Sequence, residues 1–355
     1  MEIQPIIPYP DTIPAASGWL NFFLISGFGL HLLCMTIMIG LGLIAFYYTI
    51  KGKNEESLIT KDIKTLFKLT IPYTINLGVM PFLFLQVLYG NCIYTSSILI
   101  GWYWLLIIIM LIISYYCAYL FNDKYDNNES LSKILIFISI SLLLVIAFIF
   151  LNNLSMMIKP EKWLEYFKNP NGTILNLDDN SLIPRYFHLI LASITNGGLF
   201  LCLIYNYKKQ KGDNEANTKI NIIMKWVTIS IALQILSGFI YLKKLPFEVQ
   251  YHFYGNNFYA THLLVLAIIS TLLSFIFSIK KNVNACAISS IITLIFMVLI
   301  RDFIRKAYLN PYFSISNLIE DIQYSPMLLF FVVLTLGIIV IIYMLNILKN
   351  ADWEN

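Results

Sequence analysis

Long apolar runs separated by short polar segments dominate this sequence. A helix needs about 20 apolar residues to cross a bilayer, and nine runs have that character. They cover residues 19–50, 66–90, 98–121, 131–151, 186–206, 222–242, 258–280, 283–300 and 326–348. The pattern predicts an all-α polytopic membrane protein, with one membrane domain over residues 1–355 built as a bundle of about nine transmembrane helices.

Two polar segments between the runs carry further information. The seventh and eighth runs are divided by the basic pair Lys280 and Lys281, which favours a tight turn at the membrane surface over one very long helix. The longest segment, 152–185, places Trp163, Tyr166 and Phe167 among lysines and acids. Aromatic and basic residues mixed in this way are typical of the membrane interface, so this outer amphipathic loop is expected to lie there.

Composition and charge narrow the class of protein and suggest an orientation. The chain is 58% hydrophobic and only 12% charged, against roughly 25% charged in soluble proteins. A soluble enzyme, a disordered chain and a nucleic-acid binder are thereby excluded. Most of the 24 Lys and Arg residues fall in segments that face the cytoplasm if the N-terminus is outside, notably 51–68 and 207–225. Basic residues resist translocation, so we expect an N-out/C-in, multi-pass protein of the cytoplasmic (inner) membrane.

Histidine is the candidate for chemistry inside the runs, which contain almost no Asp or Glu. His31, His188 and His262 fall in the outer halves of three predicted spans, at unequal depths, and His252 falls in an outer loop as a surface residue. Neutral imidazole is a common ligand of haem iron. The chain has no CxxCH motif for covalent haem attachment. The pattern therefore favours b-type haem, and hydrogen-bonded packing histidines are the alternative.

Arginines and glycines near these histidines fit the same hypothesis. Arg185 stands three residues before His188, and Arg301 and Arg305 lie four residues apart at the outer end of the eighth run. Arginines near the membrane surface suit haem propionates, and ordinary interface anchoring is the alternative. Glycines in 27–42 and 197–198 would let either a macrocycle or another helix come close.

Several of these residues together resemble subunit I of cytochrome bd-type terminal oxidases. The run 31–41 (HLLCMTIMIGL) is similar to the first helix of that family, in which a haem-ligating His is followed nine residues on by Gly. The segments 75–79 (INLGV) and 89–91 (YGN), with Gln86 between them, are similar to its second helix. The run 188–197 (HLILASITNG) resembles the helix of its low-spin haem His, and 308–312 weakly resembles a stretch near its last haem.

The resemblance implies a haem b-binding subunit of a respiratory oxidoreductase, with one or two haems. His188 and His262 would ligate one low-spin haem and His31 a second. Arg185, Arg301 and Arg305 would hold propionates, while Asn76, Gln86 and Tyr89 would line the site. The implied partners are other membrane subunits, a c-type cytochrome and possibly a quinol.

The sequence also departs from this family. The family's third-span glutamates and its Met ligand at the head of span seven have no match, and the loop 243–257 is short. Proton uptake through the third span is therefore not expected. Two other functions stay open: a non-catalytic membrane anchor that transfers electrons for c-type cytochromes, and a haem-free transporter or assembly factor.

Overall fold

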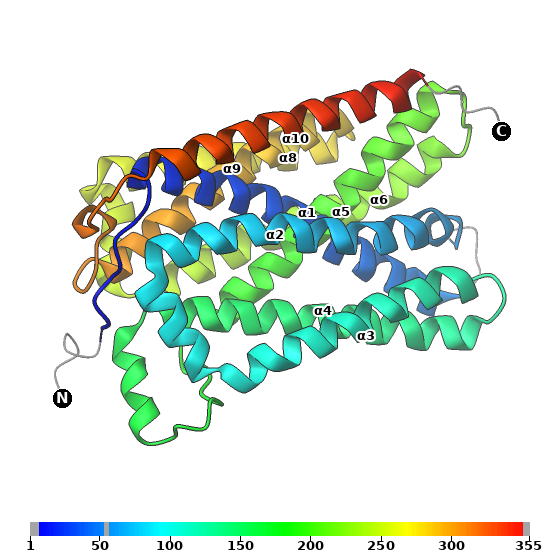
Figure 1. The fold of residues 1–355 in the computed structure, drawn as a ribbon. Coiled ribbons are helices and arrows are strands. Elements are labelled where there is room, and N and C mark those ends of the chain that lie inside the picture. The colour runs from blue at the N-terminus through cyan, green and yellow to red at the C-terminus, as the bar shows by residue number, and fades with distance from the viewer. Residues whose placement is uncertain (1–6, 53–56, 351–355) are drawn as a thin grey trace.

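The computed structural model describes residues 7–52 and 57–350, and in this part of the chain the architecture is helical. Nine of its helices are long and apolar enough to cross a membrane. These are α1 (Ser17–Lys51), α2 (Ser57–Leu99), α3 (Gly101–Lys124), α4 (Glu129–Met157), α5 (Leu182–Gln210), α6 (Ala216–Lys244), α8 (Phe258–Ile279), α9 (Val283–Leu309) and α10 (Tyr324–Asn350) (Figure 1). The predicted all-α bundle with nine spans is confirmed.

Helices that alternate in direction give the bundle two ends. The helices α1, α3, α5, α8 and α10 all begin at the left of Figure 1, at what we call the first end. The short helices η2 (Pro160–Phe167), α7 (Phe247–Tyr251), η3 (His252–Asn256) and η4 (Ile315–Asn317) lie in the connections at this end. There Ile13 donates its N–H to the Ile319 carbonyl and accepts from the Asp321 N–H, both at 2.9 Å. Which end faces the cytoplasm stays a prediction.

Two spans are much longer than their hydropathy predicts. Helix α2 extends well beyond the predicted run 66–90 at both ends, with a non-helical residue, Tyr89 (φ −131°, ψ 29°), inside it. Helix α9 continues past the predicted end at residue 300. Charged residues do not stop α9 because Asp302 pairs with both Arg305 and Lys306 on the same helix face, which satisfies the charges within the helix.

The tight turn predicted between the seventh and eighth spans is confirmed. Lys281 adopts a left-handed conformation with φ 53°, and Asn282 caps α9 by accepting the Ala285 N–H at 3.1 Å. A side-chain oxygen that accepts an N–H of the first helical turn is the usual way to start a helix. The chain therefore reverses within a few residues, and α8 and α9 pack as an antiparallel hairpin.

Helices α1 and α5 run in the same direction and cross at two glycines. A Cβ atom added to Gly40 would lie 1.9 Å from the Ser193 carbonyl oxygen and 3.0 Å from the Cα atom of Gly197. A Cβ atom on Gly197 would lie 2.7 Å from the Gly40 carbonyl carbon. The two backbones thus touch directly, and Asn196 reinforces the crossing by donating to Thr36 Oγ1 at 3.0 Å. These two glycines serve helix packing.

Helix α10 lies at the periphery of the bundle. Among its residues with described side chains none is buried, and ring contacts join Phe330 and Phe331 to Trp19, Phe23 and Phe84. Its apolar side chains therefore contribute little to the main core cluster, which is built from α1 to α6 and the start of α9.

Candidate functional site

An elongated cavity of about 380 Å³ lies between α1, α5, α6, α8 and α9. Its lining runs along α6 and onward from Ile231 to Leu245, and along α9 from Ser290 to Ile304. Fourteen residues of helix correspond to about 21 Å at 1.5 Å per residue. Most of the lining is aliphatic or aromatic, with a few polar groups. Apolar cavities of roughly 300–1,000 Å³ with few polar groups are typical of small-molecule sites.

His188 lines this cavity from the second turn of α5. Its Nδ1 lies 3.0 Å from Ser237 Oγ on α6. Its Nε2 has no hydrogen-bond partner among the described residues. The ring lies against Gly238, where an added Cβ atom would be 3.3 Å from the His188 Cε1. The neighbouring helix thus provides both a hydrogen-bond partner and a flat surface for the imidazole.

Two arginines line the same cavity without a carboxylate partner in the described part of the chain. Arg185, one turn before His188, is only 8% exposed. Its Nη2 donates to the Leu151 carbonyl at 2.8 Å, and its Nε is buried without a partner. Arg301 enters from α9, and its Nη1 is also buried without a partner. A buried, uncompensated guanidinium is costly, so this region is suited to an anionic group.

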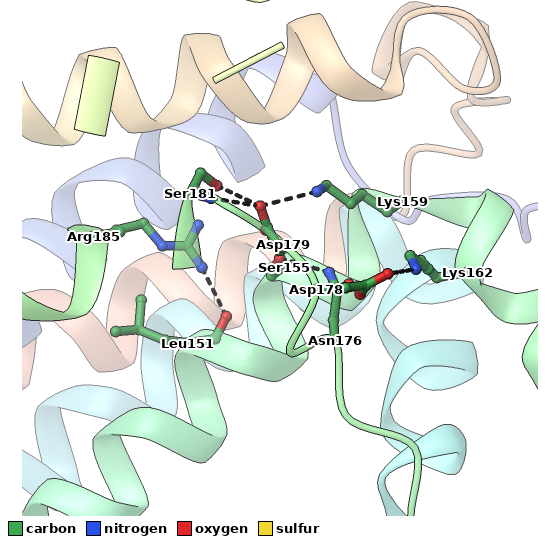
Figure 2. A network of polar contacts seen from close by, with 9 residues as sticks. All are labelled: Leu151, Ser155, Lys159, Lys162, Asn176, Asp178, Asp179, Ser181 and Arg185. Atoms are coloured by element: carbon green, nitrogen blue, oxygen red, sulfur yellow. Dashed lines mark hydrogen bonds and ion pairs between the residues drawn. The ribbon is translucent and has the colours of Figure 1, made fainter. Parts of the chain in front are cut away.

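The acid nearest to Arg185 in sequence is engaged elsewhere, as Figure 2 shows. Asp179 accepts hydrogen bonds from Ser155 Oγ and from the N–H and Oγ of Ser181, and it pairs with Lys159 at 3.0 Å. Burial by itself raises the pKa of the Asp179 carboxyl, but these hydrogen bonds and the Lys159 charge outweigh it and hold the pKa below its usual value. Asp179 therefore stays ionised at neutral pH and anchors the loop to α4.

The loop predicted over residues 152–185 covers 158–181 in the structure, and it also differs from expectation in the placement of Trp163. Helix α4 continues to Met157, and Trp163 in η2 packs inward, 3% exposed, with its Nε1 donating to the Met156 carbonyl at 3.0 Å. Tyr166 and Phe167 are exposed, as an interfacial segment requires. The short helix therefore caps the bundle with one face and exposes the other.

Arg305 and Tyr89 form a second cluster, next to the cavity. Arg305 pairs with Asp302, and its guanidinium lies 4.4 Å from the centroid of the Tyr89 ring. Tyr89 is 1% exposed, and it lines a smaller pocket of about 290 Å³ with Asn21 and Lys306. Arg305 and Tyr89 thus lie outside the cavity that contains His188.

His31 lies in the seam between α1 and α2. Its Nδ1 is 3.0 Å from the Thr74 carbonyl, and its ring covers Gly78, where an added Cβ atom would approach to 2.9 Å. His31 and His188 each lie nine residues before the glycine of the α1–α5 crossing, so the two are at similar depth, contrary to the expected unequal depths. The cavity-lining residues of α1 are Phe28, Leu32 and Thr36. His31 faces helix α2 and not the cavity.

The structure does not bring His262 together with His188. His262 is exposed, its Nδ1 lies 2.7 Å from the Phe258 carbonyl of its own helix, and its ring stacks on Phe258. The residues of α8 that line the cavity include Leu264, Ile268 and Thr271. A helix turns 100° per residue, which places His262 on the opposite face. The predicted pairing of these two histidines therefore has no support from the geometry.

The other residues expected to line the site also lie elsewhere. Asn76 is exposed on α2, Gln86 is partly buried on α2, and neither lines the cavity. Sequence reasoning missed Ser237, Gly238 and Met297. Met297 lines the cavity from α9, midway between Ser290 and Ile304. Only the dipeptide Ser-Gly inside an apolar run signalled the first two, and nothing in the sequence distinguishes Met297 from ten other methionines.

No protein-family model matches the chain, and no curated protein is significantly similar to it. The resemblance to cytochrome bd-type oxidases therefore rests on the residues of α1, α2 and α5, and the cavity is the feature from which a function can be inferred.

Proposed function

We propose that this protein binds haem b in the cavity beside His188 and transfers electrons as the membrane subunit of a respiratory oxidoreductase. One observation carries the proposal: an apolar cavity contains an imidazole with a free Nε2 together with two arginines, Arg185 one turn away on α5 and Arg301 on α9, each with a buried guanidinium nitrogen that has no partner. An amphiphile with a flat apolar body, a metal and two carboxylates matches all three features.

Each cavity residue has a distinct part in holding the macrocycle. His188 Nε2 would ligate the iron, while Arg185 and Arg301 would pair with the propionates at the first end of the cavity. Gly238 keeps the wall beside the imidazole clear of a side chain. Met297 lines the cavity from the other hairpin and carries a thioether, a known haem ligand. Met297 is therefore a better second ligand than His262, which faces away.

The haem supplies a one-electron carrier when bound, and the protein's part is to bind, orient and shield it. The apolar lining excludes water, and α7 and η3 cover the first end through Val249 and Phe253, which pack on Ile300 and Ile304. The electron donor, a c-type cytochrome or a quinol, would approach at this end, because the arginine pair would hold the propionate edge there. A second haem at His31 is not part of the proposal, since His31 does not line this cavity.

A second candidate function uses the same unpaired arginines. A haem-free protein that binds an anionic lipid-like molecule would need an apolar slot with cationic groups at one end, which this cavity also provides. The free Nε2 of His188 favours haem, because its lone pair can bind a metal, whereas a lipid carboxylate or phosphate is itself an acceptor and cannot bind a lone pair.

A visible spectrum of the purified protein tests the proposal. We expect a Soret band, a reduced-minus-oxidised α-band and a b-type pyridine haemochrome. His188→Ala should abolish the α-band, and the matched control His262→Ala should retain it. A purified, haemin-supplemented protein without a Soret band would refute haem binding and favour the anionic amphiphile.

A further inference from the structure

We propose that Ser237 is a positioning residue that holds His188 as its Nδ1–H tautomer and thereby keeps the Nε2 lone pair directed into the cavity. The inference deepens the proposed function, because it names the residue that sets the donor strength of the haem ligand. It also makes a claim about the protein without haem, which can be tested separately.

The direction of the hydrogen bonds at Ser237 follows from counting protons. A serine hydroxyl has one proton to donate and two lone pairs. Ser237 Oγ donates to the Gln234 carbonyl at 3.0 Å, as a helical serine commonly does. Both contacts can be hydrogen bonds at the same time only if the hydroxyl donates to the carbonyl and Oγ accepts from His188 Nδ1–H, 3.0 Å away. In that arrangement Nδ1 carries the proton, and in the neutral ring Nε2 carries the lone pair.

The cost of the other neutral form favours the same tautomer. In a ring protonated only at Nε2, Nδ1 could accept a proton from Ser237 Oγ only if the hydroxyl gave up its bond to the Gln234 carbonyl, so one of the two hydrogen bonds would be lost. Burial makes such a loss costly. The protein therefore selects one of the two neutral forms of His188.

The position of Ser237 is fixed by two polar contacts between rigid helices. The helices α5 and α6 are antiparallel neighbours, and a second contact joins Thr195 Oγ1 to Ser230 Oγ at 2.8 Å. The two contacts are seven residues apart on each helix, which is two turns on the same face. The register of α5 against α6 is therefore set at two points, and Ser237 cannot slide along His188.

A positioned Nδ1–H bond should affect the bound metal in a predictable direction. Donation from Nδ1–H to an acceptor makes the imidazole a stronger base at Nε2, and removing such partners typically costs 10–100-fold in metal affinity. Loss of the Ser237 oxygen should weaken haem binding and raise the reduction potential, because a weaker donor stabilises ferric iron less.

Nitrogen-15 NMR of histidine-labelled protein tests the tautomer without haem. The chain has only four histidines, so the His188 signals can be assigned from their loss in His188→Gln. We expect the Nδ1–H form in the haem-free protein and in Ser237→Thr, and a mixture of both neutral forms in Ser237→Ala. The control Thr228→Ala, on the same helix but with a hydroxyl bonded only to the Met224 carbonyl of that helix, should match the parent protein. A parent His188 protonated at Nε2, or a Ser237→Ala protein with an unchanged tautomer, overturns the inference.

Haemin titration and a redox titration of the same variants test the effect on the ligand. Ser237→Ala should bind haemin about tenfold more weakly and show a raised reduction potential, while Ser237→Thr and Thr228→Ala should behave like the parent. A parent protein that takes up no haemin refutes the proposed function and leaves the NMR result to decide on Ser237. Haem binding with parental affinity and potential in Ser237→Ala refutes the role of Ser237 alone.

Discussion

Gly40 allows the wall of the cavity to form, and Gly40→Ala is the most direct test of this packing. The α1–α5 crossing brings backbone against backbone, and an alanine Cβ at position 40 would lie 1.9 Å from the Ser193 carbonyl oxygen. Cβ contacts under 3.0 Å are essentially never observed, so the helices would have to separate by about 1.1 Å to reach even that limit. Neither side can relieve the contact by rotating a side chain.

The energetic cost follows from the lack of a flexible partner. Overpacking a filled site costs about 1–3 kcal/mol, and occasionally more. We expect the upper part of this range, about 3 kcal/mol, because the atoms in contact are main-chain atoms. Separation would also lengthen the 3.0 Å hydrogen bond from Asn196 to Thr36. Both residues line the cavity, so ligand affinity should fall together with stability.

Thermal unfolding in detergent, followed by size-exclusion chromatography, measures the effect. Gly29→Ala is the matched control on the same helix, because a Cβ atom there would meet only Val298 Cγ2 at an ordinary 3.9 Å. Gly197→Ala should be as harmful as Gly40→Ala, and the double variant should lose less than the sum of the two, because both act at one contact. If Gly40→Ala unfolds at the same temperature as Gly29→Ala, the close crossing is not a feature of the protein.

Three further predictions concern charge and orientation. Arg301→Met should stabilise the haem-free protein by about 1–3 kcal/mol, since it removes a buried unpaired donor, and it should weaken haemin binding. A lower unfolding temperature of the variant would show that Arg301 is not an unpaired, destabilising group. The Asp179 carboxyl has a folded pKa below its usual value. The ionised carboxylate therefore stabilises the loop fully above about pH 4, and this stabilisation is lost as the pH falls through the folded pKa. Proteolysis of the loop 158–181 should therefore be equally slow at pH 5 and pH 8, and faster in Asp179→Asn at both pH values. Faster proteolysis of the parent protein at pH 5 than at pH 8 would contradict this prediction. A cysteine placed at Lys211 should react with impermeant reagents only from the cytoplasmic side, and labelling of intact cells would reverse the predicted N-out/C-in orientation.

Hydropathy and local chemistry make several features of this protein readable from its sequence. The nine apolar runs specify nine spans because a bilayer requires the backbone to satisfy its own hydrogen bonds in helices. The turn at Lys280 and Lys281 and the position of Arg185 one turn from His188 are equally local. Helix ends were less predictable, since Arg305 and Lys306 prolong α9 by pairing with Asp302.

Which polar groups share a cavity depends on how the helices pack, and the sequence does not reveal it. In a soluble helix the polar face shows which side is buried, but a membrane helix is apolar all round and its pattern does not fix its rotation. His188 and His262 both stand near the start of a span, yet one lines the cavity and the other faces away because of how α5 and α8 rotate against their neighbours. Ser237 and Met297 gain their importance the same way, from helices distant in sequence that pack around His188.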